Sequence, residues 1–540
     1  MKENQIAFRK FGVMIDCSRN AVMNIAAFRR MVDILSSLGY NTIRMYTEDT
    51  YEVDGEPYFG YLRGRYSKSE LKEMDAYAAK HGIELIPCIQ TLAHLGAIFR
   101  YAEYEQIRDA NDILLVGQER TYQLIEHIFS TISECFSSRN IHIGMDEAFM
   151  LGRGTYLDKN GLEEKASIMK KHLGRVLKIA AQYGFQCEIW GDMYIRAAYG
   201  DIYEHTKDES AKVSELVPEN VKLCYWDYYH TEVSHYEAFI EKHRRLSNNI
   251  SFAGGAWTWT GYCPNNRYSL RITEAAIRAC LNKSVEDVYI TMWGDHGGEC
   301  SPFGVLPTLV AASEFAKGNF NKEKIRTRFL DKIGMEYDLF SKLEAPDEVY
   351  DKLEEEPDCS VPSTTMLFTD PLCGIFDIRV REGVAPEYYA KLSKILKTGE
   401  KNEEWGYLFT AIRALCDVME IKFDLGLKTR NAYKANDRNT LRMLAKKDYT
   451  EVLRRLDIFY DAFEVCWLTE KKSFGFEVQD VRLGGLKQRI EHCKRTIEKF
   501  VSGQLSSIPE LEEELLQPLG TKGEKIGFND WGTLVTANVL

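Results

Sequence analysis

The chain has 540 residues, 45% of them hydrophobic, and a formal net charge of −12 with acidic and basic residues interspersed. This length suggests more than one domain with a sizeable core, and the lack of a basic stripe argues against a nucleic-acid-binding protein. The N-terminus has no apolar signal-peptide region, and no later apolar run is long enough to span a bilayer, so we expect no membrane association.

The 13 cysteines are odd in number and show neither disulfide-framework spacing nor a C-x-x-C pair. Several lie inside apolar, strand-like runs, among them Cys17, Cys88, Cys187 and Cys224. This usage is typical of buried thiols in a reducing compartment, so we expect a cytoplasmic protein. Because the His, Asp and Glu residues also lack metal-ligand spacing such as H-x-x-x-H, the sequence predicts no metal and no cofactor.

One unit recurs from Phe11 to about Lys317: a short apolar run, a polar loop and a helical pattern. The apolar runs predict strands at 11–17, 42–47, 84–90, 141–147, 187–193, 222–228, 251–257 and 288–295. Apolar spacings of three and four predict helices at 23–38, 68–80, 120–136, 162–183, 235–246, 270–281 and 306–316, and the stretch before Val221 is the weakest. This alternation predicts an α/β fold, a (β/α)8 TIM barrel. A doubly wound sheet would need a Gly-rich fingerprint after the first strand, where CSRNAV stands instead.

The alternation stops beyond Gly318. Helical patterns then dominate, at 318–344, 388–397, 405–423, 440–467 and 483–500. We expect irregular structure at 345–376, an interruption of the helices at 475–485, and a partly irregular tail after Gly503. The predicted domains are a catalytic barrel at 1–317 and a mostly helical C-terminal domain at 318–540, which could support the site or wall it through a homodimer contact.

The stretch IHIGMDEAF, residues 141–149, begins as a run of β-formers and ends in two adjacent acids, Asp146 and Glu147. A strand turns successive side chains to opposite faces, so these acids share one environment only if the strand ends there. Different surroundings could then separate their pKa values. We expect Asp146 to stay ionised and Glu147 to be the general acid, kept protonated by that neighbouring charge and by burial against tryptophan. The alternative is a solvated acidic turn.

Aromatic residues mark the ends of the later strands. Five of the chain's eight tryptophans fall at the ends of strands 5 to 8: Trp190, Trp226, Trp257, Trp259 and Trp293. Active sites of such barrels lie at this face. Apolar sugar faces stack on aromatic walls while carboxylates and an Arg bind hydroxyls, so the pattern predicts a sugar pocket.

Polar residues follow the earlier strands. Arg19 offers a fixed fork for paired sugar hydroxyls, or else a salt bridge to Asp16 or Asp49. His94 could pair with Glu48 beside the acids, or else be a core histidine; His142, inside strand 4, is expected to be structural. Asp295, after strand 8, could accept from hydroxyls, or else be a solvated loop acid.

These motifs resemble glycoside hydrolase family 20, the β-N-acetylhexosaminidases. The family's strand-4 signature, His-x-Gly-x-Asp-Glu, stands here as His142-Ile-Gly144-Met-Asp146-Glu147. The family's strand-1 pattern stands here as Ile15-Asp16-Cys17-Ser18-Arg19, and its acid pair after strand 2 as Glu48-Asp49. Its histidine after strand 3 matches His94, and its strand-8 Trp-x-Glu stands here as Trp293-Gly294-Asp295. A barrel without an N-terminal α/β domain but with a helical C-terminal one is similar to a divergent bacterial branch of the family.

The resemblance implies exo-acting, retaining hydrolysis in which the substrate's own 2-acetamido oxygen attacks C1 and forms an oxazolinium ion. Asp146 would orient the acetamido N–H, and Glu147 would protonate the leaving oxygen and then activate water. Arg19 would hold sugar hydroxyls. The expected partner is a small molecule or oligosaccharide with a terminal GlcNAc or GalNAc.

The chain departs from the family after strand 7. The family's Tyr-x-Asp, whose Tyr holds the acetamido oxygen, has no match near Trp257-Thr258-Trp259, and Tyr228 is the candidate for the missing hydroxyl. The preference between gluco and galacto sugars stays open. Two alternatives remain: a non-catalytic glycan-binding barrel, and a two-carboxylate glycosidase that ignores the acetamido group.

Overall fold

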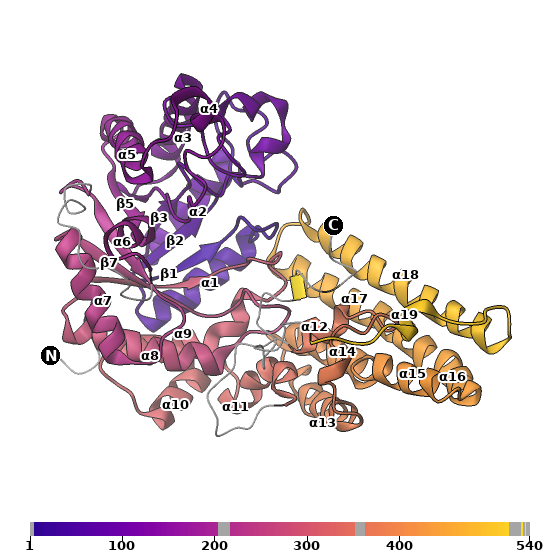
Figure 1. Cartoon of the computed structure of the whole chain (residues 1–540). Helices are drawn as coiled ribbons and strands as arrows, with labels where there is room; N and C mark the ends of the chain where they lie inside the picture. The colour runs from indigo at the N-terminus through magenta and orange to yellow at the C-terminus, as the bar shows by residue number, and fades with distance from the viewer. Residues whose placement is uncertain (1–4, 203–216, 351–361, 518–530, 533–534, 536–540) are drawn as a thin grey trace. The chain divides into compact units, whose positions relative to one another are not determined.

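Eight parallel strands close into a barrel in the order β1 to β8 (Figure 1). The computed structural model describes residues 5–202, 217–350, 362–517, 531, 532 and 535. The strands are β1 Lys10–Asp16, β2 Thr42–Tyr46, β3 Glu84–Cys88, β4 Asn140–His142, β5 Gln186–Trp190, β6 Lys222–Trp226, β7 Ile250–Gly255 and β8 Asp287–Met292. The sheet closes where β1 pairs with β8, from Lys10 opposite Asp287 to Ile15 opposite Met292. The predicted (β/α)8 barrel is confirmed.

Helices alternate with the strands and lie on the outside of the barrel (Figure 1). They are α1 Ile25–Leu38, α2 Lys68–Lys80, α3 Glu119–Cys135, α4 Thr155–Asn160, α5 Lys165–Gln182, α6 Asp192–Tyr199, α7 Val233–Leu246, α8 Asn266–Asn282, α9 Leu306–Ala316 and α10 Lys322–Ile333. Short 3₁₀ segments are η1 Ile98–Arg100, η2 Ala102–Ile107 and η4 Pro302–Val305. The weak helical pattern before Val221 falls on residues 203–216, which lie outside the described residues.

Local sequence signals fix the ends of the first two helices. The Asn24 side chain caps α1 by accepting a hydrogen bond from the Ala27 N–H, and Gly39 ends it at φ +93°. A capping box starts α2, because Ser67 accepts from the backbone of Glu70 while the Glu70 side chain accepts from the backbone of Ser67.

Strand β4 is shorter than the sequence predicts. We expected it to run through Glu147, but it ends at His142. The next residues adopt left-handed backbone conformations, at φ +73° for Gly144 and Met145 and +49° for Glu147. A strand cannot contain such residues, so the chain turns before the acid pair.

A buried charge network fills the barrel interior. Nη2 of the fully buried Arg44 lies 3.0 Å from Oε2 of Glu188 and 3.0 Å from Oδ2 of Asp287. Nζ of Lys222 lies 2.6 Å from the same Asp287 oxygen, and the Tyr289 ring lies under the guanidinium at 3.8 Å. Because these charges are paired with each other, removing one would leave a buried charge uncompensated.

The chain divides into two compact units. The barrel unit comprises Met1–Ala256, Ser269–Trp293 and Thr308–Arg328; the second unit comprises Trp257–Tyr268, Gly294–Pro307 and Phe329–Leu540. The predicted domain boundary between residues 317 and 318 stays a prediction. No helix of the described residues is long and apolar enough to cross a membrane.

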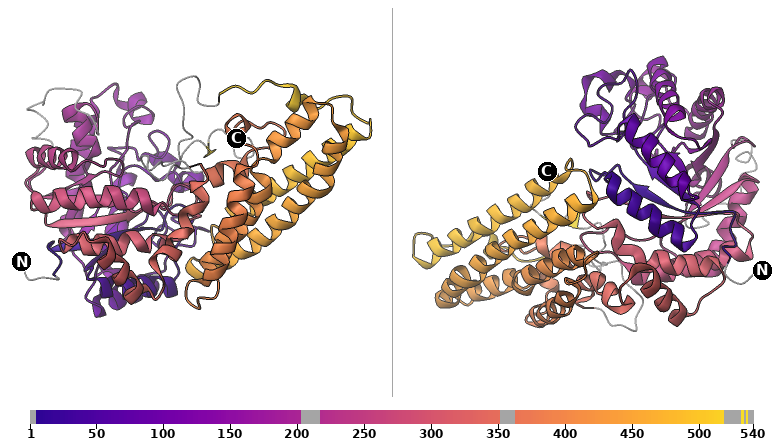
Figure 2. Two further views of the ribbon diagram at one scale, coloured as in Figure 1. Left: turned by 90° about the horizontal axis from the view of Figure 1, so that it is seen from below. Right: turned by 180° about the vertical axis from the view of Figure 1, so that it is seen from behind.

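The second unit is mostly helical, and its long helices pack side by side (Figure 2). They are α11 Tyr337–Phe340, η5 Ser341–Glu348, α12 Pro362–Phe368, η6 Asp377–Arg379, α13 Val384–Gly399, α14 Gly406–Lys422, α15 Leu425–Lys434, α16 Arg438–Leu444, the π-helical η7 Ala445–Tyr449, α17 Thr450–Glu470, α18 Phe476–Val501 and α19 Pro509–Glu512. The predicted helix 440–467 is thus divided by the π-helical turn, and α12 and α15 were not predicted.

The predicted interruption at 475–485 is wrong, because α18 runs through it. Gly475 supplies only the N-cap of this helix, at φ +92°. Gly484 and Gly485 lie inside it, where a single glycine costs about 1 kcal/mol relative to alanine. Burial of Leu483 and Leu486 on the same helix offsets that local preference, which sequence patterning alone could not weigh.

Candidate active site

The two adjacent acids after β4 face one imidazole. Oδ2 of Asp146 lies 3.2 Å from Nε2 of His94, and Oε2 of Glu147 lies 3.6 Å from the same nitrogen. Their surroundings differ: Asp146 is 8% exposed, whereas the side chain of Glu147 is 43% exposed. Because β4 has already ended at His142, the side chains of the consecutive residues Asp146 and Glu147 can both point toward His94.

Gln90, which follows β3, holds the turn that carries the acids. Its amide nitrogen donates to Oδ1 of Asp146 at 2.8 Å and to the Tyr46 hydroxyl at 3.0 Å. Its amide oxygen accepts from the Met145 N–H at 3.2 Å. A left-handed residue such as Met145 costs on the order of 1–3 kcal/mol and persists only where its surroundings fix it. Gln90 is fully buried and supplies that support.

The imidazole and Asp146 stabilise each other's charged forms. Burial alone would lower the pKa of His94, but the Asp146 carboxylate raises it to about 10. Burial likewise opposes ionisation of Asp146, but the His94 charge and the hydrogen bond from Gln90 hold its pKa below the usual value. The expected ionisation of Asp146 therefore has a physical cause in His94.

Arg19 and Glu48 form an ion pair beside this group. Nε of Arg19 lies 3.3 Å from Oε1 of Glu48, and Asp49, the other predicted acid after β2, pairs instead with Arg63 at 3.1 Å. Burial raises the pKa of Glu48 to about 7, although the Arg19 charge opposes the shift. The expected direct pair of His94 with Glu48 is replaced by the pair of His94 with Asp146.

Three tryptophans of the barrel unit gather at one buried cluster, which contains Trp190 and has Trp226 and Trp293 packed against it. Trp190 is buried, with its ring 6.0 Å from Trp293 and 4.3 Å from His142. Trp226 and Trp293 are partly exposed, and Trp226 stacks on the buried Tyr228 at 5.2 Å. These indoles form an aromatic wall, but they do not bury Glu147, so that expectation is wrong. The turn at φ +49° leaves the Glu147 side chain partly open to solvent.

Three further predicted residues belong to the second unit: Trp257, Trp259 and Asp295. Trp257 is fully buried, and its ring stacks on Trp259 at 4.7 Å. Asp295 is exposed. Their part in a site with the acids stays a prediction.

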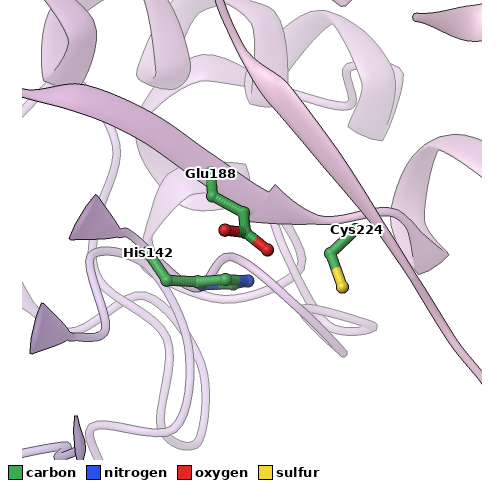
Figure 3. Close-up of side chains that lie close together, drawn as sticks. All are labelled: His142, Glu188 and Cys224. Carbon is green, nitrogen blue, oxygen red and sulfur yellow. The ribbon is translucent and has the colours of Figure 1, made fainter. Parts of the chain in front are cut away.

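One cluster in the barrel interior has metal-ligand chemistry: His142, Glu188 and Cys224 converge there (Figure 3). Nδ1 of His142 accepts a hydrogen bond from the Gly144 N–H at 3.1 Å, which leaves the proton on Nε2. Burial raises the pKa of the Cys224 thiol well above its usual value, and the Arg44 guanidinium already pairs with Glu188. The proton on Nε2 of His142, the thiol proton of Cys224 and the Arg44 guanidinium on Glu188 thus occupy the ligand groups that a metal cation would need.

A second cluster follows β6 and joins Asp227 to His230 and His235. Oδ2 of Asp227 lies 2.8 Å from Nδ1 of His230 and 3.3 Å from Nε2 of His235. Burial would raise the pKa of Asp227, but hydrogen bonds from these histidines lower it to about 2. The two imidazole rings stack at 3.5 Å and 10°, so one ion cannot lie in both ring planes. The cluster suits hydrogen bonding better than metal binding.

Two polar residues of this site escaped prediction, Gln90 and Asp192. Asp192 begins α6, and its Oδ2 accepts from the Glu147 N–H at 2.9 Å. A signal for it stands in the sequence, because Trp190-Gly191-Asp192 after β5 repeats the pattern Trp-Gly-Asp found after β8. Gln90 carries no such signal.

A closed parallel barrel with neighbouring carboxyl groups and tryptophans at the ends of its strands has the groups that glycoside hydrolysis needs. The family model for the catalytic domain of glycosyl hydrolase family 20 matches residues 8–238, and that for the glycoside hydrolase 20C C-terminal domain matches residues 338–529, together more than half of the chain. The chain belongs to glycoside hydrolase family 20, and the resemblance to its β-N-acetylhexosaminidases is confirmed.

Individual relatives are distant. Hexosaminidase D of Bos taurus is 25% identical over 251 residues, which make up 45% of this chain and 68% of the bovine protein. Hexosaminidase D of Homo sapiens is 22% identical over 221 residues, 39% of this chain and 43% of the human protein, which is less than two thirds of its length. The solved β-N-acetylhexosaminidase of Bacteroides fragilis is 19% identical, with a TM-score of 0.47. The match covers 61% of this chain and 70% of the Bacteroides fragilis chain.

Proposed function

We propose that the protein is an exo-acting, retaining β-N-acetylhexosaminidase that removes terminal GlcNAc or GalNAc from β-glycosides by substrate-assisted catalysis. The observation that carries this proposal is the arrangement of Asp146 and Glu147 on one imidazole. One carboxyl group is buried and held in its ionised form, and its neighbour is open to solvent. Substrate assistance needs this division of roles, because no protein nucleophile takes part.

Asp146 orients the substrate's acetamido N–H so that the acetamido oxygen attacks C1. The carboxylate must be ionised and fixed for this task, and the His94 charge and the Gln90 amide support both requirements. Glu147 protonates the leaving oxygen and, after the oxazolinium ion forms, removes a proton from the attacking water. Its exposed position gives both the leaving group and water access to it.

The remaining predicted residues bind the sugar. The guanidinium of Arg19, with Glu48 against it, binds ring hydroxyls, and His94 stabilises the charge on Asp146. Apolar sugar faces stack on aromatic side chains; those proposed here are Trp190, Trp226, Tyr228, Trp257 and Trp293. Asp295 is the proposed acceptor for a further hydroxyl. Whether the sugar is gluco or galacto depends on these contacts.

The test compares aryl β-glycosides of GlcNAc, GalNAc and glucose between about pH 4 and 8, where such acid/base pairs operate. We expect turnover of at least one N-acetylated substrate and little of the glucoside. Glu147→Gln should lower kcat by about 10²–10⁴-fold on poor leaving groups. Asp146→Asn should lower it by about 10²-fold, because the acetamido group is no longer oriented. Asp158→Asn, an exposed acid on α4, is the matched control.

Two other results would replace this proposal. No turnover of any substrate, together with an oxazoline-mimicking inhibitor that binds no tighter than GlcNAc, would indicate the non-catalytic glycan-binding barrel, because catalysts bind the transition state most tightly. Comparable rates on glucosides would indicate a two-carboxylate glycosidase.

A cytoplasmic location and a homodimer are further parts of the proposal. The 12 cysteines among the described residues are free thiols, and 11 of them are buried, as suits a reducing compartment. Light scattering of the purified protein tests the homodimer, and a mass of one chain, 62.2 kDa, would refute it.

A further inference from the structure

Asp192 contacts the backbone of the proposed general acid. Its Oδ2 accepts a hydrogen bond from the Glu147 N–H at 2.9 Å, across 45 residues of sequence. The side chain sits at the first residue of α6 and is 3% exposed. Its other oxygen, Oδ1, is also buried. The carboxyl group thus faces the backbone of Glu147 from the start of α6 without belonging to the acid pair.

The bond fixes a backbone conformation that Glu147 would not adopt by itself. The residue stands at φ +49°, a left-handed value that non-glycine residues rarely take. Since the peptide N–H of Glu147 is held by Asp192, rotation about the bonds of that residue would break a hydrogen bond to a buried carboxyl group. The direction of the Glu147 side chain depends on this constraint.

The charge of Asp192 also acts on the acid pair. Burial raises the pKa of Asp192 to about 7, with further increases from Asp146 and Glu147, while hydrogen bonds from the Glu147 N–H and from Trp226 oppose the shift. The titratable groups that face it are Asp146 and Glu147 from the turn after β4 and Tyr194 from α6. When the Asp192 carboxyl group ionises, its negative charge disfavours ionisation of Glu147.

We propose that Asp192 is a positioning residue for Glu147: it holds the left-handed turn that aims the general acid, and its buried carboxyl group lies against the turn that carries that acid. The inference rests on the proposed function, in which Glu147 donates the proton. It assigns to the strand-5 Trp-Gly-Asp sequence a role distinct from sugar binding.

The experiment compares the wild type with Asp192→Ala, Asp192→Asn and Asp109→Ala, using GlcNAc β-glycosides with a good and a poor leaving group. Asp109 is the matched control, because it is also buried and accepts backbone N–H groups from the same connection, at Gly152 and Tyr156, without contacting the acid pair. Thermal unfolding of each variant accompanies the kinetics.

Asp192→Ala should lower kcat on the poor leaving group by about 10–10²-fold, with little change in KM and a smaller loss on the good leaving group. Asp192→Asn keeps an acceptor for the Glu147 N–H, so its kcat on the poor leaving group should be at least about tenfold higher than that of Asp192→Ala. Because the asparagine cannot ionise, the basic limb of its kcat/KM profile should move to lower pH. Asp109→Ala should change stability without changing the leaving-group dependence.

The inference is overturned if Asp192→Ala loses equal activity on both leaving groups and the basic limb of Asp192→Asn stays in place. If Asp192→Ala does not fold, the pH profile of Asp192→Asn alone decides. A wild type that turns over no N-acetylated glycoside would reject the proposed function, and this inference with it. An active wild type with unaltered Asp192 variants would reject this inference alone.

Discussion

Replacing His94 by glutamine tests how the site keeps Asp146 ionised. Glutamine preserves hydrogen-bonding capacity but removes the positive charge that lies 3.2 Å from Oδ2 of Asp146. An opposite charge within 4–6 Å typically moves a pKa by about 1–3 units. The acid limb of kcat/KM should therefore move to higher pH by a similar amount, because Asp146 then needs a higher pH to ionise.

The same substitution should change the pH dependence of stability. The pKa of His94 rises from 6.5 to about 10 on folding, which at 1.36 kcal/mol per unit corresponds to roughly 4–5 kcal/mol. Because the folded-state pKa is the higher one, this stabilisation is fully present below pH 6.5 and is lost as the pH rises toward 10. The difference in unfolding free energy between wild type and His94→Gln should shrink over that window.

The assay combines a kcat/KM profile with urea unfolding at several pH values. His81→Gln is the matched control, because Nδ1 of His81 faces Asp33 at 3.4 Å in a pair exposed to solvent. That variant should leave the acid limb and the pH dependence of unfolding close to wild type. The reasoning is refuted if His94→Gln keeps the wild-type acid limb and loses no more stability below pH 6.5 than near pH 10.

Three other substitutions follow from the packing. Arg44→Ala leaves the buried Glu188 without its ion-pair partner and Asp287 with Lys222 alone, and should lower the unfolding free energy by about 3–5 kcal/mol, or prevent folding, as urea unfolding would show. Gly144→Ala puts a Cβ at φ +73° only 2.0 Å from Oε1 of Gln90, so the turn must shift; kcat should fall by about 10²-fold, and a wild-type kcat would contradict this account. Gly484→Ala lies in mid-helix, where the added Cβ would meet no described atom within 4 Å beyond its chain neighbours and the backbone of its own helix, so it should raise the unfolding free energy by about 0.5–1 kcal/mol and the melting temperature with it.

The sequence by itself determined the barrel, because eight apolar runs alternating with helical patterns have few other ways to bury both faces of a parallel sheet. It also determined the place of the acids, since Asp146 and Glu147 are the last residues of a predicted strand and the ends of such strands meet at one face. The signature around them was specific enough to predict the family, which the catalytic-domain model confirmed.

The tertiary structure alone decided how the site is held together. His94 pairs with Asp146 instead of Glu48, and Asp192 reaches the backbone of Glu147, through contacts between loops that follow different strands. Their partners stand about 45–52 residues apart, beyond the range of any local pattern. The early end of β4 and the continuity of α18 through its glycines likewise depend on packing, which overrides the local preferences that a sequence displays.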